Sequence, residues 1–114
     1  MRQIETQMNM AIRSLLSGGS TNWASGNTTV TKNPNNGNVT VLLHGNHIAT
    51  LNNDFVAIYD GGWQSNTTKS RLNALINEFC DGTKTGVFQK NWTWFVKAFG
   101  ITTVFHNGIS IPLL

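Results

Sequence analysis

One stretch of the chain combines glycines, hydroxyl side chains and cations in an order that suits a phosphate-binding helix start. It spans residues 61–71, GGWQSNTTKSR. A helix N-terminus exposes unpaired N–H groups and carries about half a positive charge. Here two cations, Lys69 and Arg71, add to that charge, as a phosphate site requires. The neighbouring hydroxyls belong to Thr67, Thr68 and Ser70.

The alternative for this stretch is a capped helix whose Lys69 and Arg71 side chains simply extend into water. The spacing of glycine and lysine is not that of a Walker motif, so the phosphate interpretation rests on the helix start alone.

Tryptophan is the second feature with binding chemistry, because the 114-residue chain has four. Trp92 and Trp94 are two positions apart, so on a strand they share one face with Lys90. Two indoles beside a lysine suit stacking with nucleobases, which is how single strands are held without sequence preference. The alternative is that both indoles are core, since large aromatic side chains are usually buried. Trp23 and Trp63 lie beside glycine-rich turns, where an indole either covers a pocket or closes the edge of the core.

The histidines lie at predicted tight turns. His44 and His47 flank a turn that also carries Asn46, and His106 precedes another turn. A metal site needs three or four converging ligands, and no recognised spacing is present. We therefore predict neither a metal site nor a bound cofactor. We expect His44, Asn46 and His47 to satisfy hydrogen bonds at the hairpin ends or to contact a ligand as neutral donors.

Catalytic groups are scarce in this chain. No pair among its five acids has a spacing typical of acid–base catalysis. These acids are Glu5, Asp54, Asp60, Glu78 and Asp81. No Gly-x-Ser-x-Gly nucleophile elbow is present, and Cys80 ends an apolar helix face, which predicts a buried thiol. We therefore predict a binding protein and not an enzyme.

Two helices are predicted from apolar residues at helical spacing. The first covers residues 1–16 and ends at Gly18-Gly19. Its apolar stripe comprises Ile4, Met8, Ala11, Ile12 and Leu15, and its polar side comprises Arg2, Glu5, Asn9 and Arg13. The second helix begins with Thr67 or Thr68 as N-cap and ends at Asp81-Gly82. Its apolar stripe comprises Leu72, Leu75, Ile76 and Phe79.

Short β-branched runs separated by turn residues predict the strands. Residues 39–43 and 48–51 form a predicted hairpin with a primed turn at Gly45-Asn46. Two more hairpins follow the second helix, with turns at Lys90-Asn91 and at Asn107-Gly108, the latter joining 104–106 to 109–111. Strands joined by tight turns pair antiparallel. The sequence thus predicts an α+β fold, with two helices packed on an antiparallel, hairpin-built β-sheet.

Composition limits the class of protein. With 39% hydrophobic residues, the chain supports one modest core, and we predict a single domain over residues 1–114. No run of 18 apolar residues is present, so no membrane span is expected. The absence of an apolar N-terminal stretch and the lone cysteine favour an intracellular protein. A formal net charge of +3 permits phosphate contacts without demanding them.

Three motifs resemble a group of small bacteriophage-encoded accessory proteins of unassigned function. They are SGNT at 25–28, VLLHGNHIA at 41–49, and Gly62-Trp63 followed by TTKSRLNAL at 67–75. The resemblance covers most of the chain and implies no catalytic residues. It implies a protein made in the cytoplasm of a bacterial host, where such proteins bind nucleic acid, inhibit a host enzyme or counteract a host defence, sometimes by sequestering a nucleotide signal.

Two functions stay open, ahead of a small enzyme as the third. The first is recognition of a phosphate-bearing ligand, either a nucleotide or single-stranded nucleic acid; the scarcity of lysines favours the smaller ligand. Its predicted ligand-binding residues are His44, Asn46, His47, Trp63, Thr67, Thr68, Lys69, Ser70, Arg71, Lys90, Trp92 and Trp94. The second is a protein-interaction module that inhibits a host enzyme or forms part of a phage assembly. It rests on the apolar tail 109–114, which either closes the core or docks on a host protein or a second copy.

Overall fold

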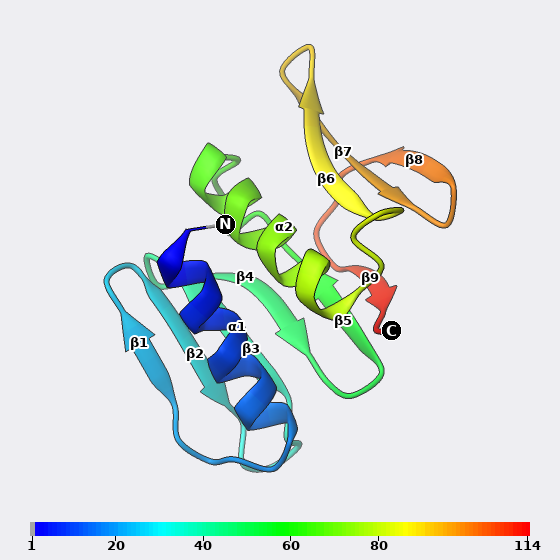
Figure 1. Ribbon diagram of the computed structural model, residues 1–114. Coiled ribbons are helices and arrows are strands. Elements are labelled where there is room, and N and C mark those ends of the chain that lie inside the picture. The colour runs from blue at the N-terminus through cyan, green and yellow to red at the C-terminus, as the bar shows by residue number, and fades with distance from the viewer. Residues whose placement is uncertain (1) are drawn as a thin grey trace.

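Two helices and nine strands form the described part of the chain, residues 2–114 of the computed structural model (Figure 1). The helices are α1 (Gln3–Leu16) and α2 (Asn66–Phe79). The strands are β1 (Trp23–Ser25), β2 (Thr28–Lys32), β3 (Val39–Leu43), β4 (Asn46–Leu51), β5 (Phe55–Ile58), β6 (Gly86–Lys90), β7 (Thr93–Ala98), β8 (Ile101–Val104) and β9 (Ile109–Pro112). Five strands follow α1 and four follow α2, which confirms the predicted α+β class. Met1, included in the predicted first helix, lies outside the described residues.

The larger sheet has the order β1-β2-β3-β4-β5-β9, and all its neighbouring strands are antiparallel. Its registers place Val30 opposite Val41, Val41 opposite Ala49, and Ala49 opposite Ile58. All four are fully buried. Because side chains alternate between the faces of a strand, these rows give the sheet one apolar face. The two helices lie over that face and enclose the core with it (Figure 1).

The smaller sheet has the order β6-β7-β8 and extends away from the larger sheet (Figure 1). Asn73 of α2 attaches it to the body of the protein. The Asn73 side chain donates to the carbonyl oxygen of Val87 and accepts from its amide, both at 2.8 Å. An edge strand leaves such groups unpaired, so Asn73 satisfies β6 where β6 packs along α2.

The C-terminal segment differs from the sequence prediction. The turn at Asn107-Gly108 closes no hairpin, because β8 pairs with β7 and β9 pairs with β5. The Asn107 side chain accepts from the Asp60 amide at 2.9 Å, and the Gly108 amide donates to the Ile58 carbonyl oxygen at 2.8 Å. The predicted hairpin is therefore wrong: the turn docks on the end of β5, and pairing between distant strands overrides the local turn signal.

A buried ion pair joins α1, α2 and the β1–β2 turn. Arg71 Nη1 lies 2.8 Å from Glu5 Oε2, and the two residues are 3% and 1% exposed. Arg71 also donates to Thr28 Oγ1 at 3.1 Å and to Asn27 Oδ1 at 3.2 Å. Ser70 Oγ donates to Glu5 Oε2 at 2.6 Å. A network of directional bonds therefore sets how α2 lies against α1 and the larger sheet.

Glu5 and Asn9 were expected on the polar side of the first helix, but both are buried. Asn9 Nδ2 donates to the carbonyl oxygen of Ala74 in α2 at 3.1 Å. The apolar stripe itself is confirmed, with Met8 and Ile12 fully buried. The prediction fails at the two polar positions because apolar periodicity does not detect polar groups that find partners on a second helix.

Burial of the Glu5 carboxylate disfavours its charged form and by itself raises the pKa. Hydrogen bonds from Ser70, Arg71 and the Arg2 amide, with the charge of Arg71, outweigh burial, so the pKa of Glu5 lies below its ordinary value. A carboxyl with a lowered folded pKa stabilises the fold above its unfolded pKa of about 4.3. That contribution is lost as the pH falls through the lower folded pKa.

Replacing Arg71 by alanine leaves the Glu5 carboxylate buried without its cation. Loss of one partner of a buried pair costs about 3–5 kcal/mol, so we expect Arg71→Ala to lower the free energy of unfolding by that amount at neutral pH. Urea denaturation followed by circular dichroism measures it. Adding Glu5→Gln should recover part of the loss, because a neutral amide needs no cation.

The matched control is Arg13→Ala, because Arg13 forms an exposed pair with Glu78 at 3.0 Å. Exposed pairs contribute about 1 kcal/mol or less. Equal losses for Arg13→Ala and Arg71→Ala would contradict the stabilising role given to the buried pair.

Candidate functional site

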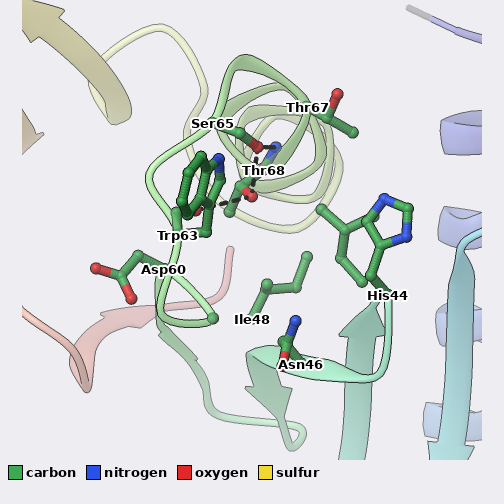
Figure 2. Close-up of a pocket in the computed structure, with 10 residues that line it drawn as sticks. His44, Asn46, Ile48, Asp60, Trp63, Ser65, Thr67 and Thr68 are labelled. Carbon is green, nitrogen blue, oxygen red and sulfur yellow. Dashed lines mark hydrogen bonds between the residues drawn. The ribbon is translucent and has the colours of Figure 1, made fainter.

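A pocket of about 440 Å³ opens at the start of α2 (Figure 2). The β3–β4 hairpin, the loop before α2 and the first turn of α2 supply its lining. The lining residues are Leu43, His44, Asn46, Ile48, Asp60, Gly61, Trp63, Ser65, Thr67 and Thr68. The pocket thus brings together five of the predicted ligand-binding residues, namely His44, Asn46, Trp63, Thr67 and Thr68.

A two-residue turn presents the imidazole that forms one wall. His44 and Gly45 occupy it with φ of 52° and 76°, and Leu43 pairs with Asn46 across it. Positive φ at both positions defines the primed turn that was predicted. The turn lies one residue earlier than expected, so Asn46 begins β4 and the exposed ring of His44 stands at its tip.

A β-bulge in β4 supplies the apolar centre of the pocket. Val41 lies opposite Ala49 and Leu42 lies opposite His47, so Ile48 is an extra residue without a partner. A bulge re-aims side chains near a strand end. Ile48 is 1% exposed and lies between the two aromatic walls of the pocket (Figure 2).

His47 is not among the residues that line this pocket. Its ring centroid lies 4.2 Å from that of Tyr59, and its Nε2 lies 2.6 Å from Thr50 Oγ1. His47 therefore satisfies hydrogen bonding within the sheet, which is one of the two roles expected for it.

Ser65 is the N-cap of α2, in place of the predicted Thr67 or Thr68. Its Oγ accepts from the Thr68 amide at 3.1 Å. The Thr68 hydroxyl lies 2.9 Å from Ser65 Oγ and donates to the Trp63 carbonyl oxygen at 3.3 Å. These capping interactions occupy both the amide and the hydroxyl of Thr68. Among residues 2–114, the Thr67 hydroxyl and the amides of Asn66 and Thr67 have no hydrogen-bond partner.

Trp63 forms the wall opposite His44, and its side chain stays open to solvent at 74% exposure. Its amide donates to the Asp60 carbonyl oxygen at 3.3 Å, which fixes the loop that carries it. The Asp60 carboxylate accepts from the Gly62 amide at 2.8 Å and from Gln64 Nε2 at 3.4 Å. Figure 2 shows this carboxylate turned away from the pocket centre, so its charge opposes an anion there only weakly.

Ser70 and Arg71 were predicted to bind phosphate, but both side chains bond to Glu5. Arg71 is 3% exposed, so its guanidinium neutralises an acid of α1 and is closed to a ligand. The structure therefore corrects the prediction that Ser70 and Arg71 contact a phosphate. No local pattern predicts this pairing, because Glu5 and Arg71 are 66 positions apart in the chain.

Lys69 does not line the same pocket as Thr67 and Thr68. It lines a shallow groove of about 480 Å³ together with Gln89, Asn91 and Trp92. The groove lies where the β6–β7 turn comes close to α2. Two predicted ligand-binding residues, Lys69 and Trp92, therefore meet there, away from the pocket that contains Trp63.

Trp92 and Trp94 do not share a strand face, so this prediction is wrong. Asn91 and Trp92 form the β6–β7 turn, with φ of 51° and 67°, and Trp92 is 92% exposed. Trp94 is 2% exposed and meets Phe105 edge-on, with ring centroids 5.4 Å apart. Lys90 is exposed at the end of β6. The turn lies one residue later than expected, which moves Trp92 out of the strand.

Several pocket residues were not among the predicted ligand-binding residues, namely Leu43, Ile48, Asp60, Gly61 and Ser65. The capping role of Ser65 was detectable, because serine is among the preferred N-cap residues. Ile48 was not, because its orientation depends on a bulge that leaves no local signature.

Within residues 2–114, no group of three or more histidine, cysteine or acidic side chains converges as a metal site would. In the same part of the chain, none of the helices has the length and apolar character that crossing a membrane requires. Cys80 is 2% exposed, as predicted, and burial raises the pKa of its thiol to about 11.

The protein is therefore a small α+β protein that has a pocket with aromatic walls at the start of α2 and a second, smaller sheet that extends away from the larger one. A family model described as Kyanoviridae Gp96 protein matches residues 1–112. The chain belongs to this phage protein family, which confirms its resemblance to small phage-encoded proteins. Nothing among curated proteins or among solved structures matches it.

The raised pKa of Cys80 predicts low reactivity. An ordinary thiol has a pKa of about 8.5, and only the thiolate reacts with alkylating reagents. We expect iodoacetamide to modify Cys80 slowly in native buffer and rapidly in concentrated guanidinium, as followed by mass spectrometry. Equal rates in both solutions would contradict a buried thiol.

Trp92 is expected to strain its turn. Positive φ costs a residue with a side chain about 1–2 kcal/mol, and an exposed indole gains little from packing. We expect Trp92→Gly to raise the free energy of unfolding by about 1 kcal/mol in urea denaturation. Trp92→Ala is the control: it keeps the positive φ and a Cβ, so an equal gain there would exclude turn strain as the cause.

Proposed function

We propose that this phage protein is a non-enzymatic binder of a small phosphate-bearing ligand, a nucleotide, and that the pocket at the start of α2 is its site. One observation carries the proposal. An exposed indole, an exposed imidazole and the first turn of α2, with the unpaired amide of Thr67, line one pocket of about 440 Å³. That volume lies within the usual range for small-molecule sites.

The aromatic walls suit a nucleobase. Trp63 offers a solvent-open ring face, and His44 stands on the opposite side with Ile48 between them (Figure 2). A base that stacks on an indole gains about 1–3 kcal/mol irrespective of its identity. The Asn46 amide at the rim has both a donor and an acceptor for a base edge.

The helix start suits the phosphate. The amides of Asn66 and Thr67 point out of the first turn, where the helix carries about half a positive charge. The Thr67 side chain lines the pocket beside them. No lysine or arginine is among the lining residues, so we propose a ligand with little negative charge, such as a nucleoside monophosphate or a cyclic nucleotide.

The chain belongs to a phage protein family. We propose that the protein acts in the cytoplasm of the bacterial host, where binding a nucleotide signal would withdraw it from a host defence.

The alternative is a protein-interaction module, and exposed apolar residues at the C-terminal end favour it. Phe99 and Leu114 are 71% and 90% exposed, and both line a groove of about 560 Å³ with Pro112 and Leu113. Ile111 of the same tail is buried, so the tail closes the core and also leaves an apolar rim. Light scattering after size exclusion tests self-association, and capture from host lysate tests a host partner.

Tryptophan fluorescence during titration with mono-, di- and cyclic nucleotides tests the nucleotide proposal. We expect quenching, with weak dependence on salt because a single phosphate is bound. Trp63→Ala should lower the affinity by about fivefold or more, as loss of one stacking contact predicts. Trp92→Phe is the matched control and should bind normally. If no nucleotide quenches the fluorescence, or if Trp63→Ala binds with the affinity of the natural protein, the pocket is excluded as the nucleotide site.

Asn66→Pro tests the phosphate contact separately. Proline is tolerated at the first helical position and removes one amide donor there. The preceding Ser65 is already extended, with φ of −104° and ψ of 162°, as a residue before proline must be. We expect Asn66→Pro to weaken binding of the nucleotide but not of its nucleoside, whereas Asn66→Ala, which keeps the amide, should bind both as the natural protein does. Calorimetry measures the four affinities.

A further inference from the structure

The net charge of the chain is confined to its last segment. The five acids and five of the eight lysines and arginines lie before residue 82, so that part is formally neutral. The remaining cations are Lys84, Lys90 and Lys97, and no acid follows Asp81 in the chain. The formal net charge of +3 therefore belongs to the segment that forms the smaller sheet and β9.

One face of the smaller sheet packs on the body of the protein, and the other is open. Val87, Trp94 and Val96 on the packed face are buried. On the open face, Phe88 lies opposite Phe95, and Phe95 lies opposite Val104. This trio, called the aromatic row below, includes two stacked rings with centroids 5.6 Å apart and an interplanar angle of 21°. Phe88 and Val104 are 38% and 59% exposed.

Lysines stand on both sides of the aromatic row. Residues two positions apart on a strand share a face, so Lys90 lies on the face of Phe88 and Lys97 on the face of Phe95. Each is about 7 Å along its strand from the neighbouring ring. Lys90 pairs with Thr93 toward the tip of the sheet and Lys97 pairs with Gly86 toward its base. The face thus alternates cation, aromatic row and cation.

Exposed aromatic side chains also stand at both ends of β7. Trp92 precedes the strand and Phe99 follows it, and they are 92% and 71% exposed. Both have positive φ, at 67° and 56°, a conformation that disfavours bulky side chains. Two exposed rings are therefore held in unfavourable turn positions on the sheet that also carries the net charge.

We propose that the open face of the smaller sheet binds single-stranded nucleic acid. Bases stack on Phe88 and Phe95, and backbone phosphates contact Lys90 and Lys97. Aromatic platforms beside cations hold single strands in this way, whereas a duplex hides the faces of its bases. A second copy of the chain fits this face less well, because a two-fold contact would bring like lysines together.

Fluorescence anisotropy of a labelled thymidine oligonucleotide tests this proposal. We expect binding that weakens as salt rises. Replacing both Lys90 and Lys97 by glutamine should reduce the magnitude of the slope of log K against log salt by about 1.4, since each phosphate contact contributes about 0.7. Phe88→Leu should lower the affinity by about fivefold or more, through the loss of one stacking platform.

Phe55→Leu is the matched control, because Phe55 is 39% exposed and lies on the larger sheet. It should bind the oligonucleotide like the natural protein, and thermal melting checks that all variants are folded. Trp63→Ala should also bind normally, which separates this face from the nucleotide pocket.

Four results of the binding measurements would overturn the proposal. They are no change in anisotropy at low salt, unchanged affinity for Phe88→Leu, loss of strand binding in Trp63→Ala, and competition by inorganic polyphosphate as strong as that by unlabelled oligonucleotide. A dimer that Phe88→Leu dissociates, seen by light scattering, would assign the face to a second copy and also overturn it.

Discussion

The contact between Glu5 and Arg71 is the constraint on which the arrangement of the other elements depends. Apolar packing alone allows a helix to rotate or slide on a sheet, whereas a buried guanidinium has fixed donor directions. Here its donors reach Glu5 in α1 and Thr28 and Asn27 near the β1–β2 turn. The cost of burying two charges is offset by these bonds. The network therefore sets the rotation of α2, and with it where its first turn meets the β3–β4 hairpin.

This constraint also separates the two candidate surfaces chemically. Arg71 neutralises Glu5 and Lys69 lines the groove beside Trp92, so no side-chain cation from α2 lines the pocket beside Trp63. The only positive charge at the pocket is the partial charge of a helix start, which favours a ligand with little negative charge. The unbalanced lysines lie on the smaller sheet instead, where several phosphates of a strand can be contacted at once. The pocket and the sheet face are therefore suited to different ligands, so each can be tested without the other.

The sequence predicted what depends on local pattern and missed what depends on distant partners. Both helices, the larger part of the strands and a primed turn between β3 and β4, predicted one residue later than it lies, follow from periodicity and turn chemistry. Five predicted ligand-binding residues meet in one pocket because they flank the same turn and the same helix start. The pairing of Glu5 with Arg71 and of β5 with β9 joins residues far apart in the chain. No local signal reports such contacts.

The turns show a similar limit, and they carry a functional argument. A one-residue shift in a hairpin turn moved Trp92 from a strand face to a tip, and pattern alone does not fix a turn to one residue. His44, Trp92 and Phe99 each hold an exposed ring at positive φ, where glycine or asparagine is more stable. Exposed rings gain little from packing, so fold stability does not account for them. Backbone strain that side-chain packing does not offset clusters at binding sites. Here such strain occurs at the pocket and at both ends of β7.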